Sequence, residues 1–173
     1  MVDVFDRPVI GRCQLHKIRN VQDRLPDKLR SLVASRMRRA YHADSALAAE
    51  AELGALAAEL DRTHPGAAAS LREGMAETLT VLRLGIPPTL ARTLRLTNAI
   101  ESMISICRDH ASNVKHWRHG AMALRWCAAG MAEAGKQFRR VNGHLHLRSL
   151  RDTLNRITET IGATRHDEIV NAA

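Results

Sequence analysis

Aromatic residues are scarce in this chain of 173 residues, since Phe, Trp and Tyr together make up 3%. Binding of unpaired bases by stacking on aromatic rings is therefore not expected for this chain. The three cysteines, an odd number without tight clustering, argue against a secreted disulfide framework and suit a reducing cytoplasm. No apolar run approaches the length of a membrane span, so we expect a cytoplasmic protein without a membrane partner.

Two further motifs are missing: a glycine-rich phosphate loop and a serine nucleophile elbow. Their absence argues against the nucleotide-dependent enzymes and hydrolases that depend on them. Positive charge is plentiful, because 26 Lys and Arg face 18 Asp and Glu, for a net charge of +8. This excess favours an anionic partner such as nucleic acid, contacted through its phosphates.

The charge is unevenly distributed along the chain. Residues 1–40 carry ten basic and four acidic side chains, residues 41–80 carry two and seven, and residues 81–127 carry seven and two. An acidic segment therefore separates two basic ones.

The spacing of apolar residues predicts a mainly α fold of six or seven helices. One short strand is expected over residues 7–16, where Val9, Ile10, Cys13 and Leu15 form a short apolar run. The loop GIPP (85–88) is expected to interrupt the helices, and the tail is expected to fray. The main helices are predicted over 27–41, 44–62, 67–84, 98–110, 119–141 and 146–161.

Two Cys-x-x-His pairs have the spacing of metal ligands: Cys13 with His16, and Cys107 with His110. Together they provide the four ligands of a zinc-stabilised helical protein. Short motifs of this kind also arise from buried cysteines on apolar helix faces, with incidental histidines nearby. We favour this second interpretation, so zinc is not expected.

Glu101 lies in the first turn of a predicted helix, between basic stretches. With Asn98 as the N-cap, Glu101 would occupy position N3 and reach back to the Asn98 backbone amide, as in a capping box. The alternative is a catalytic carboxylate. The residues alone favour the cap.

Basic side chains near this helix are candidates for phosphate contacts, and each is equally compatible with a solvated helix surface. Trp117 and Trp126 are interpreted as core or interface anchors. The candidate DNA-binding residues are Lys17, Arg19, Arg92, Arg95, Arg108, Lys115 and Arg118, with Arg125, Arg139 and Arg140 further along.

Four separated strings resemble the carboxy-terminal half of Mutator-type DDE transposases of bacterial insertion sequences, in consistent order from about Arg7 to Leu154. These strings are RCQLHKIRNV (12–21), THPGAAASLREG (63–74), LTNAIESMISICRD (96–109) and KHWRHGAMALRWCAAGMAEAGKQFRRV (115–141).

The resemblance implies a ribonuclease-H-like core interrupted by a helical insertion. In this scheme residues 1–16 hold the final core strand, 17–90 the insertion, 91–161 the C-terminal helices of the core and 162–173 a tail. Glu101 becomes the third catalytic acid and a ligand of Mg²⁺, which the intact family uses in pairs for strand cleavage and transfer. The resemblance also includes a family signature whose role cannot be derived from the residues: Cys13, His16, Thr97 and Asn98.

Two catalytic aspartates of the family pattern belong upstream of the Cys-x-x-His segment. Asp3 and Asp6 are the acids available there, and neither has the expected context. We therefore expect a truncated transposase that is inactive alone, whose partners are element-end and target DNA in the nucleoid. The alternative is a non-catalytic module that binds DNA or associates with full-length transposase or with a second copy of itself.

Overall fold

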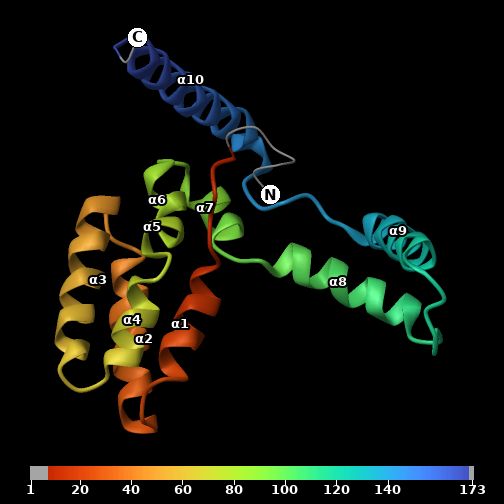
Figure 1. Cartoon of the computed structure of the whole chain (residues 1–173), viewed down its shortest axis with the longest axis horizontal. Coiled ribbons are helices and arrows are strands. Elements are labelled where there is room, and N and C mark those ends of the chain that lie inside the picture. Colours follow the sequence, from red (N-terminus) through yellow and green to blue (C-terminus); the bar gives the residue numbers. More distant parts are fainter. Residues whose placement is uncertain (1–7, 172–173) are drawn as a thin grey trace. The chain divides into compact units, whose positions relative to one another are not determined.

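The computed structural model describes the backbone of residues 8–171 and the side chains of residues 8–159 (Figure 1). Helices dominate and no strand occurs in this described part, so the predicted mainly α fold is confirmed. None of its helices is both long and apolar enough to cross a membrane. The described residues divide into two compact units: the first runs to Leu96 and resumes at Asn142, and the second comprises Thr97–Val141.

The first unit contains most of the helices. The second unit is a pair, α8 (Asn98–Ala111) and α9 (Gly120–Gln137). The helices of the first unit are α1 (Gln14–Gln22), α2 (Asp27–Ala40), α3 (Ala46–Asp61), α4 (Pro65–Arg72), α5 (Met75–Thr78), α6 (Thr80–Arg83), α7 (Pro88–Leu94), the 3-10 turn η1 (His144–His146) and α10 (Leu147–Asn171).

The main core of the first unit lies among α1, α2, α3 and α4. Val21, Met37, Leu53 and Leu71 are fully enclosed there, one from each helix. Burial of each such side chain stabilises the fold by about 1.5–3 kcal/mol. Small buried residues allow α3 and α4 to approach closely: Ala49 and Ala57 on α3, and Ala67 and Ala68 on α4.

A second cluster of the first unit joins α6, α7 and α10. Leu150, Leu154 and Ile157 of α10 pack against buried Leu84 and Leu90. Gly143 precedes α10 with a φ of 77°, and a Cβ at this position would lie 2.5 Å from the Leu90 nitrogen. Only glycine fits such a left-handed backbone against its neighbour without strain. The Thr93 hydroxyl also donates to the Asn142 carbonyl at 3.3 Å, a contact within the first unit.

The strand predicted over 7–16 is not found in its described residues. Residues 8–13 have no regular structure, and Gln14–His16 form the start of α1. The Arg12 amide donates to the Glu77 carbonyl at 3.0 Å, and the Ile10 carbonyl accepts from the Thr80 hydroxyl at 2.7 Å. The segment packs on α5 and α6, where no strand offers the repeated pairing that a ladder requires. Asp3 and Asp6 lie outside the described residues.

Several helix boundaries differ from those predicted. The helix expected over 67–84 is divided into α4, α5 and α6: Gly74, with a left-handed φ of 63°, separates α4 from α5, and Leu79 separates α5 from α6. The segment α7 was missed, since Pro88 occupies a first-turn position, where proline is favoured, instead of extending the GIPP loop. The last helix continues to Asn171 and does not end at 161.

Candidate catalytic carboxylate and basic surfaces

Glu101 lies in the first turn of α8, and its side chain is exposed. The N-cap is Thr97 and not Asn98, so the predicted capping box is wrong by one residue. The Glu101 amide donates to the Thr97 carbonyl at 2.9 Å, and the Thr97 hydroxyl donates to Glu101 Oε1. The carboxylate is thereby held over the helix N-terminus, where the helix dipole favours negative charge. Asn98 is exposed as the first residue of the helix.

A pair of divalent cations requires several carboxylates around it. Among the residues that the structure describes, no three His, Cys, Asp or Glu side chains gather closely enough to hold a metal ion. The residues around Glu101 therefore do not fit a two-metal centre by themselves.

The two Cys-x-x-His pairs belong to different units. Cys13 is the half-buried N-cap residue of α1, and with His16 and Lys17 it lines a hollow of about 340 Å³. Cys107 lies in α8, where burial, with the nearby Cys127, raises the pKa of its thiol. A raised pKa favours the neutral thiol over the thiolate that binds metals. The His110 ring contacts the Ile106 carbonyl through Nδ1 at 3.0 Å.

Lys17 was predicted to contact DNA, and the structure corrects this. Its side chain is 3% exposed, and its ammonium donates to the carbonyls of Ser70, at 2.6 Å, and Glu73. The Glu73 carboxylate lies 3.5 Å away. Lys17 thus satisfies the carbonyls at the end of α4, a structural role that hides its charge from phosphates. Arg19, two residues later, is exposed.

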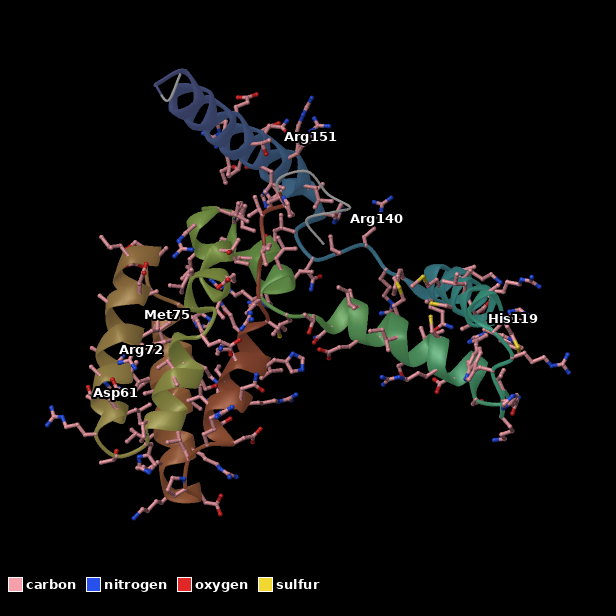
Figure 2. All side chains as sticks on the ribbon, in the orientation of Figure 1. Asp61, Arg72, Met75, His119, Arg140 and Arg151 are labelled. Carbon is pink, nitrogen blue, oxygen red and sulfur yellow. The ribbon has the colours of Figure 1, made fainter. Side chains whose placement is uncertain are left out.

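In the second unit the candidate basic residues are exposed. Lys115 and Arg118 lie in the connection from α8 to α9, which ends at His119 (Figure 2). The His119 ring accepts a hydrogen bond from the Met122 amide and caps α9. Arg140 projects from the segment that follows α9 (Figure 2). Arg108, Arg125 and Arg139 are also exposed.

The tryptophans line an apolar groove of about 220 Å³ between α8 and α9. Trp117 and Trp126 line this groove together with Met103, Cys107 and Met131, and they remain 44% and 36% exposed. Their role as core or interface anchors stays a prediction. No residue of α8 is buried, and exposed apolar side chains remain along both helices.

Arg92 and Arg95, two further candidates in the first unit, line one cleft at the end of α7. Arg38 of α2 and His42, which follows the end of α2, also line this cleft. Sequence reasoning singled out neither Arg38 nor His42, because helix periodicity does not show which faces of distant segments meet. The run of arginines on α2 was the available signal.

The family model described as "Transposase, Mutator family" matches residues 1–141. The chain belongs to the Mutator family of transposases. No curated protein and no solved structure matches it. The matched region of this Mutator-family chain spans α1 to α9 and includes Glu101 as well as the arginines of the cleft.

Proposed function

We propose that this Mutator-family chain acts in DNA transposition, binding DNA phosphates through its basic surfaces and contributing Glu101 as one catalytic carboxylate. The family match over residues 1–141, which includes the TNAIES segment, carries the proposal. The exposed position of Glu101 at a helix start supports it, since a metal ligand must be accessible.

Cleavage of DNA by this family would use Mg²⁺ ions to activate water or a 3′-hydroxyl and to stabilise the leaving oxygen. The described residues supply Glu101 without the further carboxylates that such ions need. We therefore propose that the chain binds DNA by itself and cleaves DNA only when other carboxylates complete the centre.

The proposal extends to the architecture. Residues 17–90 would be the helical insertion, and residues 91–161 the C-terminal helices of a ribonuclease-H-like core. The separate hydrophobic core within α1 to α4 supports the first assignment, since an insertion needs a core of its own.

Fluorescence anisotropy with a labelled duplex of the element's end tests DNA binding. We expect affinity to fall steeply with salt, and Lys115→Gln and Arg118→Gln each to reduce the slope of log K against log salt by about 1. Lys136→Gln is the matched control, because Lys136 is already paired with Glu133 at 2.7 Å. Equal slopes of log K against log salt in all three variants would contradict the proposed phosphate contacts of Lys115 and Arg118.

Incubation of the same duplex with Mg²⁺ tests the second part. We expect no nicking by the chain alone. Nicking that disappears in Glu101→Gln would contradict the proposed incompleteness of the centre while supporting the role of Glu101.

One observation favours the alternative function, a module that associates with intact transposase. The second unit exposes large apolar side chains, including Ile100 at 60%, Leu124 at 73% and Trp117 at 44%. Exposed apolar surface of this kind is typical of interaction sites. Co-purification with intact transposase of the same element, lost in Leu124→Glu and kept in Leu47→Glu on α3, would support this alternative.

A further inference from the structure

A cleft of about 310 Å³ lies in the first unit, between α1, α2 and the end of α7. Its walls are fixed to one another. The Gln14 amide of α1 donates to the Arg95 carbonyl at 3.1 Å, and the Gln14 side chain donates to the Thr78 carbonyl at 3.0 Å. The cleft is therefore a preformed feature of the fold, of a volume that suits a small ligand.

Its positive charge is uncompensated. Arg38, Arg92 and Arg95 line the cleft, and no carboxylate pairs with any of them in the part of the chain that the structure describes. Other arginines of α2 behave differently: Arg36 lies 2.5 Å from Glu59, and Arg39 lies 3.5 Å from Glu52. Arg30 of α2 is likewise paired, with Asp27, so the arginine of this helix without a carboxylate partner among the described residues is Arg38, which lines the cleft.

Arg95 adds a specific indication of a ligand. Its side chain is half-buried, and its Nε is enclosed without a hydrogen-bond partner. Burial lowers the pKa of this guanidinium, because desolvation disfavours the charged form. Buried polar atoms without partners are rare in folded proteins, and the guanidinium that carries this one lines the cleft.

The remainder of the lining is mainly apolar, including Leu15, Ile18, Pro88 and Leu96. Inorganic phosphate would contact the arginines and make no apolar contact with this wall. A DNA duplex keeps its bases stacked inside and offers only sugar and phosphate. An unpaired nucleotide offers both a phosphate and a base with apolar faces, and so matches both parts of the lining.

We propose that this cleft binds one nucleotide of single-stranded DNA, with its phosphate on Arg38, Arg92 and Arg95 and its base against Leu15 and Pro88. The base is held by aliphatic contact, which suits a chain with few aromatic residues. The inference rests on the proposed function, since it assumes that the chain acts on DNA.

Anisotropy of the full chain with labelled oligothymidylate of about 12 nucleotides, compared with the same strand in a duplex, tests the inference. We expect Arg38→Gln and Arg92→Gln each to weaken single-strand binding about tenfold, the typical effect of losing a charged hydrogen bond. Arg39→Gln is the control, because it removes the same charge from a neighbouring position outside the cleft.

Leu15→Trp fills the apolar wall without changing charge. We expect it to weaken single-strand binding at least about fivefold, the lower end of a base contact. Duplex binding should be unchanged. Leu32→Trp is its control, because Leu32 is 59% exposed and lies outside the lining. Arg38→Gln changes an exposed side chain and keeps the test valid if Leu15→Trp does not fold.

Losses that exceed the controls and affect the single strand more than the duplex would support the cleft. Equal losses on both DNA forms would overturn it in favour of a phosphate contact alone. Losses no greater than those of the controls would also overturn it, and retained duplex binding would then leave the proposed function standing. A chain that binds no DNA would end both proposals.

Discussion

The Arg72 guanidinium donates to both carboxylate oxygens of Asp61, with Nη1 2.8 Å from Oδ1 and Nη2 bonded to Oδ2 (Figure 2). This two-point ion pair joins the last residue of α3 to the last residue of α4. It is part of a series of exposed pairs on the first unit, together with Arg36 and Glu59, and Arg12 and Glu73.

These pairs predict acid sensitivity. The hydrogen bond from Arg72 holds the pKa of Asp61 below its ordinary value. A carboxylate with a lower pKa in the folded state stabilises the fold above its unfolded pKa, about 3.9, and this contribution is lost as the pH falls through the folded pKa. We expect Asp61→Asn to reduce the acid-induced loss of unfolding free energy below about pH 4.

Urea unfolding at a series of pH values measures this loss. The effect should be small, because both side chains are about half exposed and solvent screens the pair. Asp152→Asn on α10 is the control, since it removes an exposed carboxylate that is not bonded to Arg72. Identical pH profiles for the two variants would contradict the prediction.

A second prediction concerns Lys17. Lys17→Met should destabilise the chain by about 2–4 kcal/mol, because the Ser70 carbonyl, in a buried hydrogen bond, and the Glu73 carbonyl, in a partly buried one, lose their donor. Lys28→Met, on the exposed face of α2, should change the unfolding free energy by less than about 0.5 kcal/mol. Urea unfolding followed by circular dichroism distinguishes them. A similar stability for both variants would show that Lys17 is not an anchor.

The two glycines of α9 provide a third prediction. A Cβ at Gly130 would lie 2.7 Å from the Cys107 Cα, whereas nothing lies within 4 Å of one at Gly135. Gly130→Ala should destabilise the packing of α8 and α9 by about 1–3 kcal/mol. Gly135→Ala should be neutral or stabilising by up to about 1 kcal/mol, through higher helix propensity.

Tryptophan fluorescence is a direct measurement for this pair of variants, since Trp117 and Trp126 both belong to the second unit. An equal shift of the two unfolding midpoints would show that the close approach at Gly130 does not hold the helices together.

Hydrogen exchange gives the fourth prediction, for the segment before α1. The Arg12 amide should be protected, because it donates to the Glu77 carbonyl, while the amides of exposed Val9 and Ile10 should exchange fast. The α3 amides around Leu53 should be the slowest. Strong protection at Val9 and Ile10 would indicate strand pairing that the structure does not contain.

The sequence predicts the helices well where apolar residues recur at helical spacing along one face and turn residues mark the ends of the helix. α2 and α8 match their predicted ranges within a residue, because periodicity and flanking turn residues are local signals. The segment over 7–16 fails for the opposite reason. Its apolar run is short, and packing of Ile10 and Arg12 on α5 and α6 decides its conformation.

The candidate sites show the same division. That Glu101 lies at an accessible helix start follows from local sequence. Lys17 is buried, and Arg38 and Arg95 line the same cleft, because particular helices pack together. Charge and residue spacing in the sequence do not show which helices these are. The role of Glu101 as a third acid and the domain boundaries stay predictions.

The hydrogen bond between Thr93 and Asn142 joins residues 49 positions apart in the chain. It closes a loop that contains the whole second unit, and the entropy of this closure opposes the docking of α10 on α7. The core of α1 to α4 needs no such closure and is complete in sequence by Leu79. During synthesis this core is therefore free to form first. Leu84 and Leu90 pack against Leu150 and Leu154 only after α10 has been made, so the apolar surface of α7 stays exposed until then.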